Sequence, residues 1–127
     1  MLQQLMREMF SSMVEAKDIS KVEEYYDPDF MLYTNGQVQD FAAFRAGHER
    51  VYPTGISYSV RYDDDAWVEN GDRLAGRVWI TTSRPGEDPT EIEVMLIAQF
   101  RGGRILRLWE LTWPDWSNMK AFDSYDG

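Results

Sequence analysis

The stretch ISYSVRYDDDAWVENGDRLAGRVWITTSRPGEDPTEIEVMLIAQFRGGRILRLWELTW, residues 56–113, alternates between apolar and polar side chains over much of its length. Such alternation is typical of strands with one buried face. Turn signals divide the stretch at Asn70-Gly71-Asp72, at Pro85-Gly86-Glu87-Asp88-Pro89 and at Gly102-Gly103. The pattern therefore predicts an antiparallel meander of four strands, over 56–69, 73–83, 90–100 and 104–113.

The residues before this stretch have a helical period instead. Residues 2–17 place apolar side chains at helical spacing, which predicts an amphipathic helix. Asp18 predicts the N-cap of a short second helix that ends before Pro28. Helices followed by a run of strands indicate an α+β fold.

A strand and a third helix complete the first half of the chain. Phe30–Thr34 is predicted to be a strand, and Asn35-Gly36 turns the chain after it. Asp40 is predicted to cap a helix over Phe41–Tyr52. We expect residues 1–127 to form a single domain, with 114–127 as a flexible polar tail.

Composition excludes several classes of protein. The formal net charge of −9 argues against a nucleic-acid partner, because phosphate contacts need clustered Lys and Arg. The chain has no cysteine, which excludes disulfides, thiolate zinc sites and a cysteine nucleophile, and suits the cytoplasm. No apolar run is long enough to span a membrane, and the N-terminus lacks the pattern of a signal peptide.

The last strand carries apolar side chains on both faces, with Leu106 and Leu108 on one of them. One face of the strand over 90–100 is apolar throughout, with Ile92, Val94, Leu96 and Ala98. The opposite face of the last strand is also apolar, with Ile105, Trp109, Leu111 and Trp113. An antiparallel strand that is apolar on both faces needs two covers. The helices supply one, and we expect a second copy of the chain to supply the other, in a homodimer packed sheet to sheet.

The order of these elements resembles the nuclear transport factor 2-like superfamily, in its SnoaL-like and ketosteroid-isomerase-like branches. The resemblance rests on three motifs: Lys17-Asp18-Ile19 through Tyr25-Tyr26-Asp27-Pro28-Asp29-Phe30, Asn70-Gly71-Asp72-Arg73, and Gly103-Arg104-Ile105 leading into Leu108-Trp109-Glu110. It implies a cone-shaped curved antiparallel sheet wrapped around three N-terminal helices, with a mostly apolar pocket inside. It does not imply one activity, because this fold hosts enzymes and non-catalytic binding modules.

The same resemblance argues against steroid isomerisation. The position that resembles the isomerase's general-base aspartate is Thr34 in this chain. The positions that resemble its oxyanion tyrosine and its protonated aspartate are Phe10 and Leu96. All three chemical roles are therefore missing at those positions.

Glu110 is the strongest catalytic candidate. It shares a strand face with Leu106 and Leu108, and the resemblance turns that face into the pocket. A carboxylate on an apolar wall is unfavourable unless it is paired or protonated, so it would have a raised pKa suited to acid–base chemistry. The alternatives are an open strand end or neutralisation of Glu110 by an arginine.

Arg77 is the expected partner of Glu110. The resemblance points Ala75, Arg77, Trp79 and Thr81 inward, although hydropathy favours the face with Leu74, Val78 and Ile80. We follow the resemblance, so that Arg77 either pairs with Glu110 or binds a ligand oxygen. A surface or interface position for Arg77 is the alternative.

Further pocket candidates are weaker. His48, the one histidine, has a pKa range suited to proton transfer, but a structural role is the alternative. A single histidine and the spacing of the carboxylates predict no metal site, and no phosphate-binding loop or dinucleotide motif is present, so no cofactor is expected. We expect Trp79, Thr34, Tyr58, Leu96 and Leu108 to contact the ligand.

Two functions follow from these residues. The first is a cofactor-free isomerase, cyclase or dehydratase that acts on a small hydrophobic molecule by proton transfer, with Glu110 as acid or base. The second is a non-catalytic module of the same fold that binds a small ligand or another protein chain. The state of Glu110 discriminates between them, because a carboxylate locked to Arg77 in a filled core would leave no acid or base for a reaction.

Overall fold

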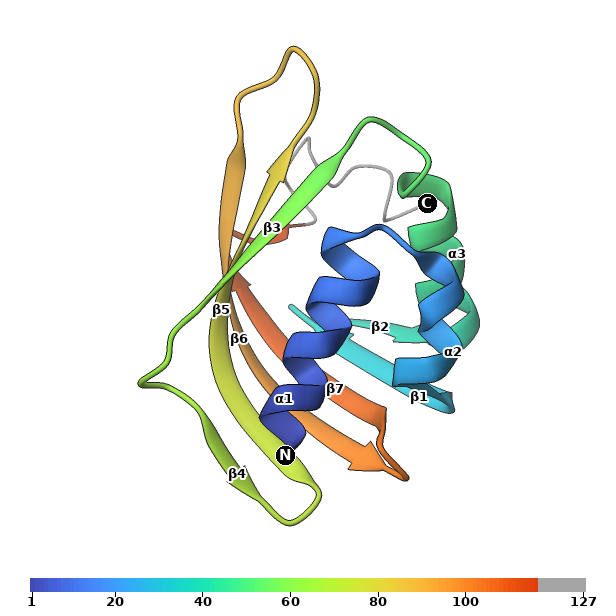
Figure 1. Cartoon of the computed structure of the whole chain (residues 1–127), viewed down its shortest axis with the longest axis vertical. Helices are drawn as coiled ribbons and strands as arrows, with labels where there is room; N and C mark the ends of the chain where they lie inside the picture. The colour runs from blue at the N-terminus through green and yellow to red at the C-terminus, as the bar shows by residue number, and fades with distance from the viewer. Residues whose placement is uncertain (117–127) are drawn as a thin grey trace.

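The computed structural model describes residues 1–116 of the chain. Its helices cover one side of a strongly curved, open sheet, and together they form the cone expected of the α+β fold (Figure 1). The predicted fold class is confirmed. The part of the predicted tail over 117–127 lies outside the described residues, and the single domain over 1–127 stays a prediction.

The first predicted helix is present but changes its geometry halfway. It begins as α1 (Leu2–Met9) and continues as a π-helical segment, η1 (Phe10–Glu15). Lys17 has a φ of +53°, which is left-handed backbone, so the helix ends before residue 17. Within residues 1–116, none of the helices combines the length and the apolar character that crossing a membrane requires.

Both predicted N-caps are confirmed. The carboxylate of Asp18 accepts a hydrogen bond from the backbone N–H of Ser20 at 3.1 Å, and the short helices η2 (Ile19–Lys21) and α2 (Val22–Tyr25) follow. The carboxylate of Asp40 accepts one from the N–H of Ala43 at 2.9 Å, at the start of α3 (Phe41–Val51). These bonds satisfy N–H groups that have no partner within the helix.

Seven strands build the described sheet, in the spatial order β2-β1-β7-β6-β5-β3, with β4 also paired to β5. They are β1 (Tyr26–Thr34), β2 (Gln37–Asp40), β3 (Ser57–Tyr62), β4 (Val68–Asn70), β5 (Arg73–Ser83), β6 (Thr90–Arg101) and β7 (Arg104–Trp113). Strands β5, β6 and β7 form the predicted antiparallel meander. Strand β1 pairs in parallel with β7, so the whole sheet is mixed.

The strand predicted over 56–69 is two strands in the structure. Strand β3 ends at Tyr62, and a turn follows in which the N–H of Ala66 donates to the carbonyl of Asp63 at 3.1 Å. The turn brings the ring of Trp67 over Gly76, where an added Cβ would lie 2.2 Å from the ring. Only a residue without a side chain fits under this ring.

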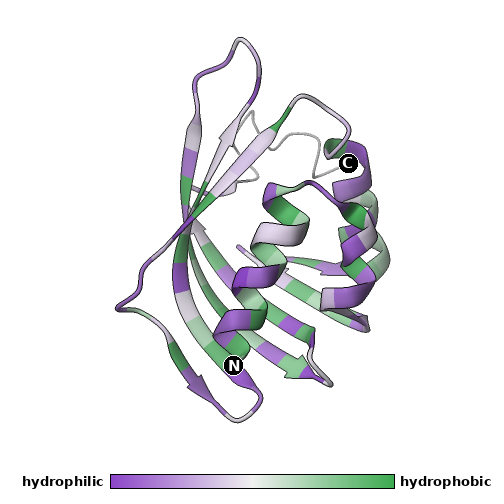
Figure 2. Cartoon of the chain, viewed as in Figure 1, coloured by the Kyte–Doolittle hydropathy of each residue, from purple (hydrophilic) through white to green (hydrophobic). Residues whose placement is uncertain are grey.

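The concave face of the sheet and the apolar sides of the helices form the core (Figure 2). The predicted inner face of β6 is buried throughout, with Ile92, Val94, Leu96 and Ala98. Ile105 was expected on the outer face, and this expectation is wrong, because Ile105 is buried in the core. The pairing of β6 with β7 shifts by one residue between Gln99 and Phe100, which moves Ile105 to the inner side.

Candidate functional site

A cavity of about 140 Å³ lies between the helices and the concave face of the sheet, and residues of both line it. Apolar side chains make up most of its wall, among them Met6, Met9, Phe10, Met13, Phe44, Ile80, Ile92, Val94, Leu96 and Leu108. Its polar residues are Tyr26, Gln39, His48, Tyr52, Tyr58, Glu110 and Thr112. Among the described lining residues there is no lysine or arginine, so the cavity offers no cation to an anionic ligand.

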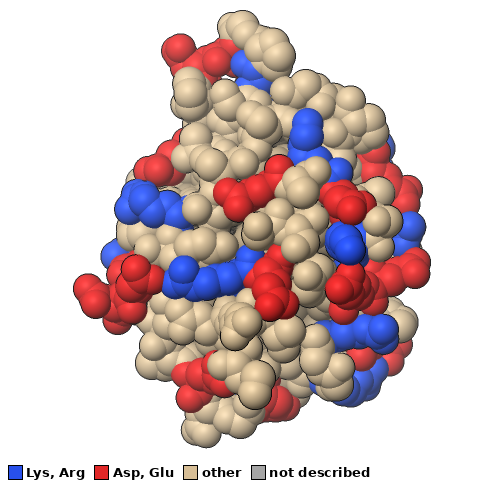
Figure 3. All heavy atoms as spheres, in the orientation of Figure 1, with Lys and Arg blue, Asp and Glu red and all other residues tan. Residues whose placement is uncertain are grey.

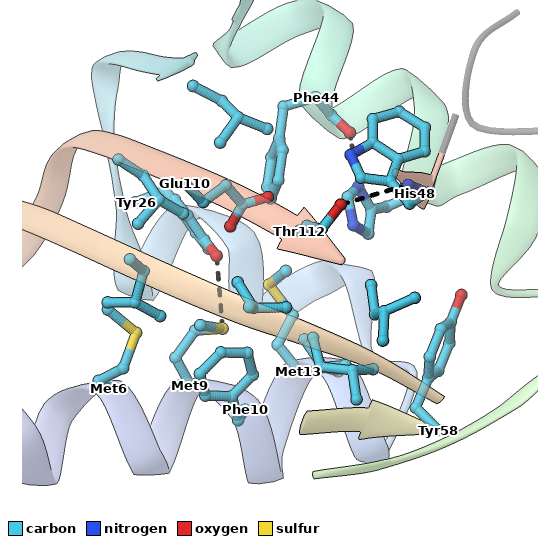
Figure 4. Close-up of a pocket in the computed structure, with 18 of the residues that line it drawn as sticks. Met6, Met9, Phe10, Met13, Tyr26, Phe44, His48, Tyr58, Glu110 and Thr112 are labelled. Carbon is cyan, nitrogen blue, oxygen red and sulfur yellow. Dashed lines mark hydrogen bonds between the residues drawn. The ribbon is translucent and has the colours of Figure 1, made fainter. Parts of the chain in front are cut away.

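Glu110 lies on β7 and points its carboxyl group into this cavity (Figure 4). Glu110 as a whole residue is half-buried, but protein atoms enclose its carboxyl group. Burial raises the pKa of Glu110 to about 7, and a hydrogen bond from Thr34 acts in the opposite direction. The carboxyl group can therefore gain or lose a proton near neutral pH.

Thr34 lies beside Glu110, because residues 34 and 110 are partners in the pairing of β1 with β7. The Thr34 side chain is fully buried and is not part of the cavity wall, so its expected direct contact with a ligand is wrong. Its hydroxyl group also accepts a hydrogen bond from the indole N–H of Trp116 at 3.2 Å. Thr34 supports the Glu110 carboxyl group from behind.

Tyr26 is the second polar residue near Glu110 (Figure 4). Its hydroxyl group donates a hydrogen bond to the sulfur of Met9 at 3.4 Å. Burial raises the pKa of Tyr26, and the negative charge of Glu110 raises it further, so the phenol stays neutral. A neutral phenol next to a carboxyl group can donate a hydrogen bond to a ligand oxygen.

His48 lines the cavity from α3, as predicted. Its Nδ1 lies 2.8 Å from the carbonyl oxygen of Phe44, and this contact is a hydrogen bond donated by Nδ1–H (Figure 4). Burial lowers the pKa of His48 to about 4. The imidazole is therefore neutral at pH 7 and does not compensate the charge of Glu110.

Two tyrosines supply hydroxyl groups at the cavity. Tyr58, on β3, lines it as predicted, and Tyr52 follows α3. Their phenol oxygens are buried and have no hydrogen-bond partner within residues 1–116. A buried hydroxyl group without a partner is unfavourable, so both are suited to bind a polar atom of a ligand.

Arg77 and Trp79 lie on the outer face of β5, so their expected place in the pocket is wrong. The guanidinium group of Arg77 binds Asp63 and Glu93, with a distance of 3.3 Å to Glu93 Oε1. Trp79 lies between two guanidinium groups, 3.8 Å from that of Arg61 and 4.7 Å from that of Arg77. Hydropathy indicated the correct face, since Leu74 and Val78 are buried.

This arrangement removes one of the two sequence-based alternatives for Glu110. Its carboxyl group has no arginine partner in the described residues, and it borders an open cavity. The same residues contain no group of three or more His, Asp or Glu side chains that could hold a metal ion. The chemistry that the cavity offers is proton transfer at Glu110, with neutral hydrogen-bonding groups around it.

The sequence of residues 6–108 matches the profile of the SnoaL-like domain family. The chain belongs to the SnoaL-like domain family. The matched residues include most of the cavity wall of this SnoaL-like domain, whereas Glu110 lies two positions beyond them. No curated protein sequence matches the chain.

Solved structures share the fold of this SnoaL-like domain at low sequence identity. PrhC from Penicillium brasilianum has a TM-score of 0.74 at 18% identity, over 87% of this chain and 79% of its own. IdmH from Streptomyces antibioticus, a candidate polyketide cyclase, has a TM-score of 0.69 at 14% identity, over 99% and 98%. A candidate isomerase from Rhodopseudomonas palustris has a TM-score of 0.73 at 11% identity, over 99% and 96%. At these identities the likeness shows the fold alone.

The structure brings together five of the predicted site residues at one cavity: Glu110, His48, Tyr58, Leu96 and Leu108. Sequence analysis missed Tyr26 and Trp116 as neighbours of the site. Tyr26 had been placed near the end of the second helix, and Trp116 in the polar tail. Both are aromatic residues next to a strand. Such residues are too common in sequences for this feature to identify a pocket residue.

Proposed function

We propose that this SnoaL-like domain binds a small uncharged organic molecule in its cavity and transfers a proton on it through Glu110. An isomerase, a cyclase and a dehydratase all need such a step. The observation that carries the proposal is a carboxyl group with a pKa raised to about 7, enclosed in an otherwise apolar cavity. A general base works best when its pKa lies near the working pH.

The proposed step begins with ionised Glu110. The carboxylate removes a proton from a carbon atom next to a carbonyl group, which leaves an enolate, and the protonated Glu110 then returns the proton to another atom of the same molecule. The hydroxyl groups of Tyr26, Tyr52 and Tyr58 are the candidates to donate a hydrogen bond to the enolate oxygen. Arg77, on the outer face, has no part in this step.

The cavity also limits the class of substrate. Its described wall has no cationic side chain and one carboxyl group, which disfavours an anionic ligand. Its volume of about 140 Å³ is close to that of a cavity that holds a benzene-sized molecule. The substrate that fits without side-chain movement is therefore an uncharged molecule with about one ring. That IdmH is a candidate polyketide cyclase agrees with an organic carbonyl compound.

Deuterium exchange at carbon tests the proposal without knowledge of the natural substrate. Cyclohexanone, and the larger and more acidic 2-indanone, are incubated with the protein in D₂O, and the loss of the protons next to the carbonyl group is followed by ¹H NMR. We expect faster exchange with wild-type protein than with buffer, and exchange at the buffer rate with Glu110→Gln. The matched control is Glu8→Gln, an exposed glutamate on α1, which should exchange like wild type. Equal rates for wild type and Glu110→Gln with both ketones would contradict the proposal.

A non-catalytic ligand-binding module is the second candidate. It is favoured by Thr34, Phe10 and Leu96, which occupy the positions where the resemblance to ketosteroid isomerase would need an acid, a phenol and another acid. Under this reading, 2-indanone raises the melting temperature of wild type and of Glu110→Gln alike, and no exchange occurs. The thermal shift and the exchange rate together separate the two functions.

We further propose that the outer face of the sheet binds a second copy of the chain. Exposed apolar side chains gather there on β6 and β7, namely Met95, Ile97, Leu111 and Trp113. The first three of them border a shallow hollow of about 620 Å³. Trp113 is 76% exposed, which is unfavourable for so large an apolar group in a monomer. On the helix-bearing side of the molecule that Figure 3 shows, acidic and basic side chains are interspersed without a continuous basic patch. A nucleic-acid partner is therefore not proposed, and the cytoplasm stays the proposed location.

A further inference from the structure

The chain folds back over the cavity after β7. Trp116 is 8% exposed and lines the cavity, although it lies beyond the last strand. Two hydrogen bonds hold it there: its backbone N–H donates to the hydroxyl oxygen of Thr112, and its indole N–H donates to that of Thr34, both at 3.2 Å. The indole N–H is thus directed at the residue that supports Glu110.

The turn between β1 and β2 anchors this segment. The side-chain amide of Asn35 donates to the hydroxyl oxygen of Thr112 at 2.7 Å and to the carboxylate of Asp115 at 3.2 Å. The amide oxygen of Asn35 accepts from the backbone N–H of Thr112 at 3.0 Å. Asn35 has a φ of +49°, a left-handed conformation that asparagine tolerates better than most residues. Trp116 is therefore held by several bonds and not by packing alone.

The Thr34 hydroxyl group stands between Trp116 and Glu110. A hydroxyl group has one hydrogen to donate and two lone pairs to accept with. Trp116 occupies one lone pair, which leaves the hydrogen free for the carboxylate of Glu110, the partner of Thr34 in the pairing of β1 with β7. A hydroxyl group that accepts a hydrogen bond becomes a better donor, because the two bonds polarise each other.

We propose that Trp116 is a positioning residue for Glu110: its indole N–H holds the Thr34 hydroxyl group as an acceptor and so directs the hydroxyl hydrogen to the Glu110 carboxylate. The hydrogen-bond chain runs from Trp116 to Thr34 and then to Glu110. It favours the ionised form of Glu110, which is the form that removes a proton. The catalytic meaning of the chain rests on the proposed function, whereas the chain itself does not.

Other titratable groups also face Glu110 and must be kept constant in a test. Tyr26 faces it from β1, His48 from α3, and Tyr52 and Tyr58 lie on the cavity wall after α3 and on β3. Helix α1 contributes Met6 and Met9, and β6 contributes Leu96, none of which titrates. Asp115 is bound to Asn35, at the start of the segment that carries Trp116.

The test is a direct titration of the Glu110 carboxyl group. Protein is labelled with ¹³C at the glutamate side-chain carboxyl carbon, and the signal that disappears in Glu110→Gln is assigned to Glu110. Its midpoint is measured in wild type, Trp116→Phe, Thr34→Val and the double variant. The matched control is Trp79→Phe, which changes a tryptophan on the outer face of β5.

We expect Trp116→Phe to raise the midpoint by about 0.3 pH unit, because cooperative strengthening adds about 10–30% to a hydrogen bond to a charged group. Thr34→Val should raise it by about 1 to 2 pH units, since it removes the whole bond. In the Thr34→Val background, Trp116→Phe should add no shift. Trp79→Phe should leave the midpoint at the wild-type value.

Three results would overturn the proposal: no shift in Trp116→Phe, a lowered midpoint, or an equal shift in both backgrounds. The last would mean that Trp116 acts by packing and not through Thr34. If Trp116→Phe does not fold, the same titration is made with 3-benzothienylalanine at position 116, which keeps the ring shape and lacks the N–H. Because the titration needs no substrate, it can succeed even if no ketone exchanges deuterium, and the two proposals fail separately.

Discussion

The carboxyl group of Glu110 should destabilise the folded protein at neutral and basic pH, and Glu110→Gln should remove this effect. In the fold, protein atoms surround the carboxyl group and no described cation pairs with it. Ionisation in such a place is unfavourable, so the folded protein keeps a proton that the unfolded chain releases. A glutamine at position 110 is neutral at every pH and has no such effect.

The size and sign of the effect follow from the pKa. Burial raises it from the ordinary 4.5 to about 7 in the folded protein. Between these two values the folded state binds more protons than the unfolded state, so the free energy of unfolding falls as the pH rises. The difference of about 2.5 pH units corresponds to about 3 kcal/mol of unfolding free energy. This contribution is lost as the pH rises from 4.5 to 7 and is absent above pH 7.

The assay is urea unfolding of wild type and Glu110→Gln in steps from pH 4.5 to pH 8. The stability of Glu110→Gln relative to wild type should grow by about 3 kcal/mol over this range. Comparison of the two proteins cancels the contributions of all other titrating groups. Glu8→Gln, with an exposed side chain, should follow the wild-type curve. If the curves of wild type and Glu110→Gln stay parallel, Glu110 titrates alike in both states and the reasoning is refuted.

Three further predictions concern other residues. Burial lowers the pKa of His48 from 6.5 to about 4, so wild type should lose stability as the pH falls through this range. In urea unfolding, the free energy of unfolding of His48→Asn should fall by about 3 kcal/mol less than that of wild type over the same range. An equal fall in both proteins would contradict this prediction. Gly76→Ala should lower the urea-unfolding free energy by about 1–3 kcal/mol, because a Cβ would meet the Trp67 ring, and an unchanged midpoint would show that the ring moves freely. Leu111→Lys should convert the proposed dimer to a monomer, as measured by light scattering. A wild-type protein that is already monomeric would contradict the dimer proposal.

Much of the fold could be predicted from local sequence. Helical periodicity and the capping carboxylates of Asp18 and Asp40 marked the helices, because these signals act within one or two turns. Glycine-containing turns separated the strands of the meander, where Gly71 and Gly102 have positive φ angles. Strand β2 was missed, because its residues are mostly exposed and carry no apolar alternation.

The candidate site could be predicted only in part. Glu110 was found because it is a carboxylate on the inner face of an apolar strand, which is a local property. The orientation of Arg77 was predicted wrongly, since the family resemblance was preferred to the hydropathy of its own strand. Trp116 reaches Thr34 across 82 positions of sequence, and no periodicity reports such a contact.

The measurement that tests the central claim most directly is the titration of the Glu110 carboxyl carbon in the wild-type protein by ¹³C NMR. The claim is that Glu110 exchanges protons near neutral pH inside an apolar cavity. The account predicts a midpoint of about 7, shifted by the addition of 2-indanone. A midpoint near the ordinary value of 4.5, with or without the ketone, would show a solvated carboxylate and would contradict the account.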